Sequence, residues 1–164
     1  MTVQTDATTH TREDIVARNL AAVEQHFHNE TAEKIDLAIA VYTDDIVWEV
    51  PARGLILRDR EEVKREYLGI FDSMVIHKIT GLRRFATESW VFDDSIFEFT
   101  ITGNGFRNCP FPPGSEVSVR LTHCFEMRDG KVCREIGYEI WRLADNDNVV
   151  NDSIPDSVTV ETFD

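Results

Sequence analysis

Positive charge is scarce in this sequence. Lysine and arginine number 17 against 30 aspartates and glutamates, which gives a formal net charge of −13 over 164 residues. The basic residues form no run, so no stretch of the sequence is suited to following the phosphates of a nucleic acid. We therefore expect no nucleic-acid partner.

Cysteine is also scarce, and the three residues Cys109, Cys124 and Cys133 have no CxxC spacing. An odd number without that spacing is typical of free thiols in a reducing compartment, rather than of disulfides or a zinc site. The pair His26 and His28 is only two residues apart on a predicted helix, where such side chains do not face one site. We expect no metal and no organic cofactor.

Long apolar runs are absent. No segment approaches the roughly 20 apolar residues that span a membrane, and the first residues have no apolar region typical of a secretion signal. A soluble, cytoplasmic protein without a membrane partner is therefore expected. The predicted organisation is a flexible segment 1–11, one domain over 12–143 and an acidic tail over 144–164. Apolar residues between Val149 and Phe163 predict that this tail docks on the domain or on a partner, and a fully solvated tail is the alternative.

The most informative feature is a titratable side chain on the apolar face of a predicted strand. Residues Val117 to Met127 alternate between apolar and polar, and His123 lies between Leu121 and Phe125 on the apolar side. Burial is expected to lower the pKa of His123, which suits a general base or a neutral donor to an oxyanion. The alternative is a structural histidine with a buried hydrogen-bond partner.

A second strand follows the turn signal Asp129-Gly130. Its alternation puts Ile136, Tyr138 and Ile140 on the inner face. Its outer face would then carry Glu135, Glu139 and Trp141. Exposed aromatic residues on that outer face predict a homodimer that forms through the sheet.

Helical spacing of apolar residues predicts three helices. The first runs from its cap Thr11 to about His28, the second from Thr31 to about Tyr42, and the third begins at the cap Asp59 and ends near Met74. A short strand at Ile46–Pro51 separates the second and third helices.

Strands dominate after Ile76. Lys78–Phe92 is predicted as one long strand and Asp93-Asp94 as a two-residue turn that places Trp90 opposite Phe97. Residues 103–114 form a loop long enough to rim a site. Helices followed by hairpin-connected strands predict an α+β fold, in which a cone-shaped, curved antiparallel sheet wraps around three helices. A pocket between the two layers is the natural place for a small molecule.

Two segments carry a family resemblance. Tyr42–Pro51 (YTDDIVWEVP) and Phe125–Val132 (FEMRDGKV), together with the order of elements, resemble the nuclear transport factor 2-like superfamily. Within it they resemble the SnoaL-like polyketide cyclases and the relatives of ketosteroid isomerase. The resemblance covers about 12–143 and implies the cone-shaped fold. It leaves the reaction open among isomerases, cyclases, dehydratases, epoxide hydrolases and non-catalytic binders.

The resemblance also implies roles for individual positions. The isomerases carry an aspartate base just before the proline of the first strand, where this sequence has Val50. They carry a protonated acid that donates to the oxyanion two residues before the hairpin segment, where this sequence has His123. Cyclases and epoxide hydrolases carry an aspartate on the last strand, and only a one-residue shift would supply Glu139 there.

These arguments define the candidate site. His123, Tyr138 and Glu98 are the candidate catalytic residues; simple alternation sends Glu98 outward, but an epoxide hydrolase aspartate falls near its position. The candidate substrate-binding walls are Trp48, Val50, Tyr67, Phe71, Met74 and Ile140. For Trp48, Tyr67, Phe71 and Met74, packing in the core is the alternative.

Two functions remain open from the sequence. The first is an enzyme without metal or cofactor that transfers a proton on a small, mainly apolar, oxygen-bearing substrate, by cyclisation, isomerisation, dehydration or epoxide opening. The second is a ligand-binding or dimerisation domain whose pocket has lost its chemistry, which Val50 favours.

Overall fold

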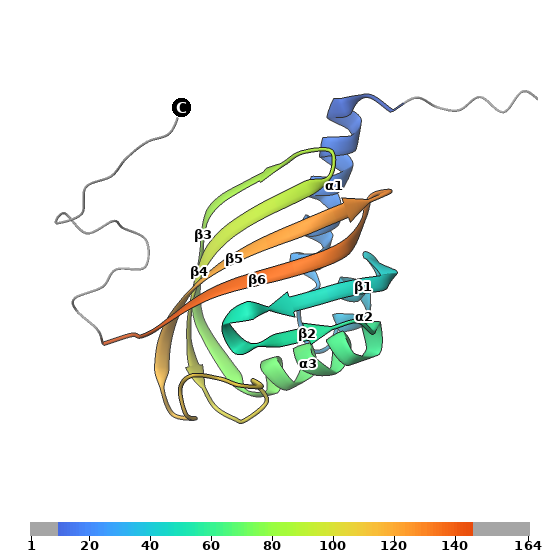
Figure 1. The fold of residues 1–164 in the computed structure, drawn as a ribbon. Helices are drawn as coiled ribbons and strands as arrows, with labels where there is room; N and C mark the ends of the chain where they lie inside the picture. The colour runs from blue at the N-terminus through green and yellow to red at the C-terminus, as the bar shows by residue number, and fades with distance from the viewer. Residues whose placement is uncertain (1–9, 146–164) are drawn as a thin grey trace, which may run out of the picture.

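The computed structural model describes residues 10–145, in which a curved six-stranded sheet packs against three α-helices (Figure 1). This arrangement confirms the predicted α+β fold with a sheet wrapped around helices. The predicted flexible segment up to residue 9 lies outside the described residues, as does the tail from residue 146 with its proposed docking segment.

Two of the helices begin where the sequence supplies caps. Helix α1 (Arg12–His28) has a capping box between Thr11 and Asp14, and α3 (Arg60–Asp72) begins after Asp59, whose carboxylate accepts from the Glu62 amide. Helix α2 (Ile35–Ile39) is shorter than predicted at both ends. It begins at Ile35 rather than at Thr31, without a side-chain cap, and the chain has entered strand β1 by Tyr42. In the part of the chain that the structure describes, no helix is long and apolar enough to cross a membrane.

The strands are β1 (Tyr42–Val50), β2 (Leu55–Leu57), β3 (Met74–Ala86), β4 (Trp90–Ile101), β5 (Glu116–Arg128) and β6 (Lys131–Leu143). A 3₁₀ turn at Pro51–Arg53 joins β1 to β2. The order across the sheet is β2-β1-β6-β5-β4-β3. Strands β1 and β6 pair in parallel, so the sheet is mixed and the prediction of a purely antiparallel sheet was wrong at this pair. A parallel pair needs a long crossover, and the elements between β1 and β6 supply it.

The hairpin of β3 and β4 turns at a different place from the one predicted. Strand β3 ends at Ala86, and the backbone amides of Ser89 and Trp90 donate to the Thr87 hydroxyl in the turn. Phe97 therefore faces Ile79 rather than Trp90. The predicted turn residues Asp93 and Asp94 lie buried in the middle of β4. Their charges are compensated by arginines, which is why two adjacent aspartates occur inside a strand here.

Strand β6 contains a bulge that reverses its predicted faces. Met127 pairs with Val132 and Glu126 pairs with Arg134, so Cys133 is an extra residue in the strand. After the bulge, Glu135, Gly137, Glu139 and Trp141 line the cavity on the inner face. Tyr138 and Ile140 are 50% and 51% exposed on the outer face. The predictions that Tyr138 and Ile140 face inward, and that Glu135, Glu139 and Trp141 face outward, were therefore wrong.

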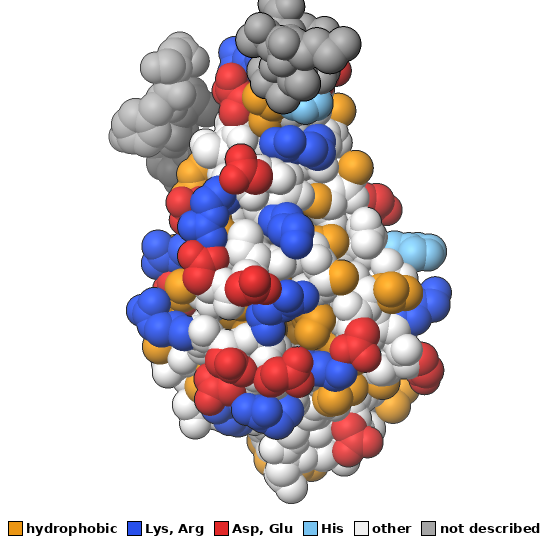
Figure 2. Space-filling model, turned by 90° about the vertical axis from the view of Figure 1, so that its right-hand side faces the viewer, with side chains coloured by type: hydrophobic (Ala, Val, Ile, Leu, Met, Phe, Trp, Pro, Cys, Tyr) orange, Lys and Arg blue, Asp and Glu red, His pale blue; other side chains and the backbone are white. Residues whose placement is uncertain are grey.

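Acidic and basic side chains are interspersed on the face of the molecule drawn in Figure 2. Surface ion pairs such as Arg60–Asp44 and Lys64–Asp36 connect separate elements. Exposed pairs of this kind contribute little to stability, about 0–1 kcal/mol each, so the fold depends mainly on its buried contacts.

Two glycines let the loop 103–114 approach helix α3. A Cβ at Gly105 would overlap the carbonyl oxygen of Gly69 and would lie 2.5 Å from the Ser73 hydroxyl. The Ser73 hydroxyl accepts from the Gly105 amide at 2.6 Å. This contact fixes the loop against the helix and places Phe106 at the edge of the cavity.

We predict that Gly105→Ala lowers the free energy of unfolding by about 1–3 kcal/mol, because the added methyl group would force the loop away from helix α3. Gly81→Ala is the control, since a Cβ there meets no atom within 4 Å, and its effect should stay within about 0.5 kcal/mol. Urea unfolding of both variants measures the difference, and equal midpoints would contradict this account of the loop.

Candidate functional site

A cavity of about 240 Å³ lies between the inner face of the sheet and the helices. Its wall is mainly apolar and includes five of the predicted substrate-binding residues, namely Trp48, Val50, Tyr67, Phe71 and Met74, as well as the predicted catalytic His123. Tyr138, Ile140 and Glu98 do not line it. Glu98 Oε2 lies 3.6 Å from Lys78 Nζ, and the Glu98 side chain is 43% exposed. The structure therefore removes these three residues from the candidate site.

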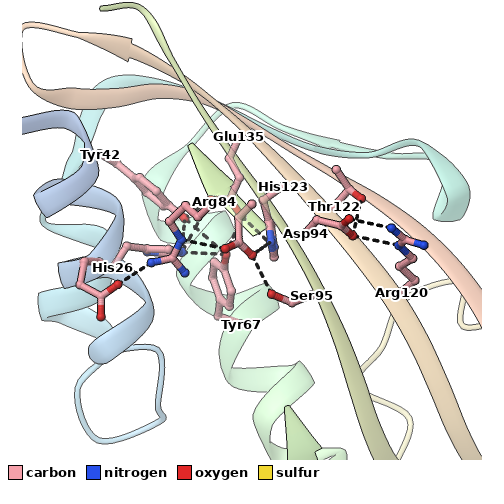
Figure 3. Close-up of polar contacts among 12 residues, drawn as sticks. His26, Tyr42, Tyr67, Arg84, Asp94, Ser95, Arg120, Thr122, His123 and Glu135 are labelled. Atoms are coloured by element: carbon pink, nitrogen blue, oxygen red, sulfur yellow. Dashed lines mark hydrogen bonds and ion pairs between the residues drawn. The ribbon is translucent and has the colours of Figure 1, made fainter. Parts of the chain in front are cut away.

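His123 lies between two carboxylates (Figure 3). It projects from β5 and is only 5% exposed. Its Nδ1 is 4.0 Å from Asp93 Oδ2, and its Nε2 is 3.9 Å from Glu135 Oε1. These distances are those of ion pairs rather than hydrogen bonds. Among the described residues, Nδ1 has no hydrogen-bond partner.

Asp93 is fixed by other groups and not by His123. Arg84 Nε donates to Asp93 Oδ1 at 2.7 Å, and the Ser95 hydroxyl donates to Oδ2 at 2.9 Å. Burial would raise the pKa of Asp93, but its contacts with His123, Arg84 and Ser95 outweigh burial and lower it. Asp93 is therefore a fixed negative charge beside the imidazole.

Glu135 is fixed by two tyrosines from other elements. The hydroxyl of Tyr42 donates to Oε2, and the hydroxyl of Tyr67 donates to Oε1 at 2.9 Å. Burial and the negative charge of Glu135 raise the pKa of both tyrosines well above 10, so both remain donors. His26 also contacts this pair of tyrosines, since its Nε2 lies 3.4 Å from the Tyr67 hydroxyl oxygen. Its other ring nitrogen, Nδ1, lies 3.1 Å from the Ala38 carbonyl oxygen. That carbonyl can only accept, so Nδ1 carries the proton.

The surroundings of His123 reverse the direction predicted for its pKa. Burial by itself lowers this pKa, as predicted from the sequence. The negative charges of Asp93, Glu135 and Glu30 raise it by more, so the pKa of His123 lies above its ordinary value. The prediction of a ring held neutral by burial was therefore wrong, because the sequence did not reveal these carboxylates.

Glu30 is a further carboxyl group of the cavity wall, from the segment just after helix α1. Burial raises its pKa above the ordinary range and Glu135 adds to the effect, while His26 and His123 partly oppose it. A carboxylate with a raised pKa in an apolar cavity is a stronger base than a solvated one.

A second polar cluster borders the cavity around Arg53, which is 4% exposed. Arg53 Nε donates to both carboxylate oxygens of Glu139 at 3.2 Å, and Nη1 donates to Glu66 Oε1 at 3.1 Å. The Trp141 indole donates to Glu139 at 2.7 Å, and Arg107 also pairs with Glu66. The cluster joins the 3₁₀ turn after β1, helix α3, the loop 103–114 and β6.

The sequence did not indicate most of the polar groups of the cavity. Asp93 was predicted as a turn residue, Glu135 was predicted on the outer face, and Arg53 and Glu30 were not considered. Only Glu139 had a signal, since the one-residue shift that the family resemblance required is the shift that the bulge supplies. The Cys133 bulge has no signature of its own in a strand of this composition.

On β6, the outer face of the sheet carries aromatic and aliphatic residues other than those predicted. Trp141 and Phe97 line the cavity. The exposed apolar residues of the outer face of β6 include Tyr138 and Ile140, with Leu143 at its end. The homodimer remains a prediction, with these residues as its proposed contacts.

Comparisons with known proteins agree with this fold. The family model of the SnoaL-like domain matches residues 23–135, which is more than half of the chain. The search of curated proteins found no match. A LEH-like epoxide hydrolase from M. tuberculosis has 17% identity and a TM-score of 0.59, with 76% of this chain and 84% of that chain covered. A proposed SnoaL-like polyketide cyclase from Jannaschia sp. CCS1 has 15% identity and a TM-score of 0.63, with 80% and 91% covered.

The structure of an NTF2-like protein from Burkholderia xenovorans LB400 is similar to that of this chain to the same degree. It has 13% identity and a TM-score of 0.63, with 76% of this chain and 91% of that chain covered. At such low identity these structures are evidence for the fold alone.

We predict that the pKa of His123, measured by NMR titration of its ring signals, lies above 6.5 and falls in Asp93→Asn, which removes one of the charges that raise it. Glu98→Gln, which removes a charge on the outer face, should leave it unchanged. Because the folded pKa exceeds the unfolded one, the contribution of His123 to stability is complete below about pH 6.5 and is lost as the pH rises through the folded pKa. A wild-type pKa at or below 6.5 would contradict the prediction.

Proposed function

Because this chain belongs to the SnoaL-like domain family, we propose that it is an enzyme that transfers a proton on a small, mainly apolar, oxygen-bearing substrate. The reaction is of the cyclase, isomerase, dehydratase or epoxide hydrolase type. The observation that carries the proposal is the position of His123, a buried titratable ring between two carboxylates in an apolar cavity. Nδ1 is fully buried, whereas Nε2, 3.9 Å from Glu135 Oε1, makes no hydrogen bond among the described residues, and a substrate oxygen could supply one there.

In this proposal His123 acts as the acid. Its raised pKa favours the imidazolium near neutral pH, and an imidazolium can donate to a carbonyl, hydroxyl or epoxide oxygen as negative charge develops there. Asp93 and Glu135 stabilise that charged form. The apolar wall around the ring strengthens each of these interactions, because the effective dielectric constant is low.

Glu30 acts as the base. Glu135 is a poor candidate, since both of its oxygens already accept from tyrosine hydroxyls. Val50, at the position of the isomerase base, cannot accept a proton. Glu30 lines the cavity, and burial raises its pKa. An acid that loses its proton at high pH and a base that gains one at low pH together give a bell-shaped pH profile.

A second function, ligand binding without turnover, is favoured by Val50. Its side chain is buried and apolar where the related isomerases carry their base, and it lines the cavity. A protein of this kind would bind the same apolar molecules without catalysing proton transfer.

We predict that the protein accelerates exchange of the α-hydrogens of small cyclic ketones in D₂O, and that His123→Gln lowers the rate by at least about 100-fold, the usual contribution of a general acid. Proton NMR measures the exchange. Cys124→Ala, next to His123 but outside the cavity wall, should stay within about twofold of wild type. Wild-type rates in His123→Gln would exclude the acid role, and ketone binding without any exchange in wild type would support the second function.

The base role has a test of its own. Glu30→Gln keeps the size of the side chain and removes its basicity, so exchange should fall by about 100-fold while ketone binding is retained. The exchange rate that remains in Glu30→Gln should no longer fall at acidic pH, because the variant has no carboxylate to protonate at this position. An unchanged acidic limb would assign the base to a different residue.

A further inference from the structure

The Arg53 side chain has donors that the protein does not use. Arginine carries five N–H groups. Nε donates to Glu139, and Nη1 donates to Glu66 and to the Arg107 carbonyl. Within residues 10–145, Nη2 makes no hydrogen bond, although Arg53 is 4% exposed and lines the cavity. Two N–H groups are therefore available to a ligand in the cavity.

The guanidinium is also held in a fixed orientation. Its Cζ lies 6.0 Å from the centre of the Trp48 ring and 5.6 Å from that of Phe106. Both rings line the same cavity. Aromatic rings on a guanidinium fix its plane and exclude water, which favours hydrogen bonding to an entering oxygen atom.

Arg53 and His123 belong to separate parts of the cavity. His123 lies beside Glu135, and Arg53 is bound to Glu139. These two glutamates are four residues apart on β6, a distance of about 13 Å at about 3.3 Å per residue. Gly137 lies between them, and the nearest side-chain atoms to a Cβ placed there would be 3.5 Å away on Leu121 and 3.6 Å away on Val50. The floor between the two polar clusters is therefore apolar.

The charges around Arg53 are balanced. The arginines Arg53 and Arg107 face the carboxylates of Glu66 and Glu139. A ligand carboxylate would add an uncompensated negative charge to a buried cluster, which is unfavourable at low dielectric constant. A neutral acceptor, such as the oxygen of a ketone, ester or ether, meets no such cost.

We propose that the cavity binds an uncharged molecule with two oxygen acceptors separated by apolar carbon. One acceptor is bound by His123 and the other by Nη2 of Arg53. This inference rests on the proposed function, since it defines the substrate class of the same cavity. Arg53 is thus a specificity-determining residue that contacts the end of the substrate remote from the reaction.

The test compares two ketones with the same carbon skeleton, 4-cyclohexylcyclohexanone and 4,4′-bicyclohexanone. Trp48 and Trp141 line the cavity, so quenching of tryptophan fluorescence can report binding to the full-length protein. We expect the diketone to bind about tenfold more tightly, as one hydrogen bond to a charged group allows. The carboxylate 4-(4-oxocyclohexyl)cyclohexanecarboxylate should bind more weakly than the diketone.

Two variants separate ligand binding from a structural role. Arg53→Lys keeps a positive charge beside Glu66 and Glu139 but lacks the Nη2 donors, so the preference for the diketone should fall from about tenfold to about one. Arg107→Lys is the matched control, because Arg107 contacts the same Glu66, is half exposed and does not line the cavity. Its preference should equal that of wild type. A purely structural Arg53 would weaken both ketones equally and leave their ratio unchanged.

Equal wild-type affinities for the two ketones, or no binding of either, would overturn the inference. So would a preference that persists in folded Arg53→Lys protein. If Arg53→Lys does not fold, the affinities of the wild-type protein for the three ligands still test whether the cavity prefers an uncharged molecule with two acceptors. The measurement needs no turnover, so a diketone preference without hydrogen exchange would refute the proposed reaction and leave the substrate class standing.

Discussion

The structure depends on the compensation of carboxylates that are buried on the inner face of the sheet and beside it. Glu135 is only 1% exposed, and Glu66 and Asp93 are almost equally buried. An isolated buried charge is strongly unfavourable, so each of these groups needs donors close by. The donors come from other elements, because Tyr42 begins β1, Tyr67 lies on α3 and Arg84 lies on β3. Polar contacts therefore tie the sheet to the helix that closes the cavity, and loss of one partner of such a pair costs about 3–5 kcal/mol.

This compensation also shapes the chemistry of the cavity. Groups whose hydrogen-bonding capacity is filled by the protein, such as Glu135, act as fixed charges. Groups with unused capacity, His123 and Arg53, are the ones that can contact a ligand. The division between the two kinds of group follows from which donors and acceptors the neighbouring elements supply. A site in an apolar cavity can thus be identified by its unsatisfied atoms rather than by the residue types that line it.

The sequence was a good guide to local structure and a poor one to the polar site. Caps at Thr11 and Asp59, the turn at Asp129-Gly130 and the inward position of His123 follow from short-range patterns, and all are present in the structure. The pairing of β3 with β4 was misjudged because Asp93 and Asp94 resemble turn residues until their arginine partners are known. These partners come from positions 84 and 120, and such distant contacts leave no periodic signal.

The bulge at Cys133 has a consequence for comparing this cavity with those of related chains. If Cys133 paired with Glu126 instead of bulging, every later residue of β6 would move one place along β5, and Ile136, Tyr138 and Ile140 would face the cavity. The two carboxylates and the glycine that β6 contributes to the cavity would then be replaced by two isoleucines and a tyrosine. Whether the strand bulges at Cys133 thus decides the chemistry of the cavity as much as the residues of the strand do. Two relatives with identical last strands can hold different cavities, and an alignment transfers a site between them only after their bulges are superimposed.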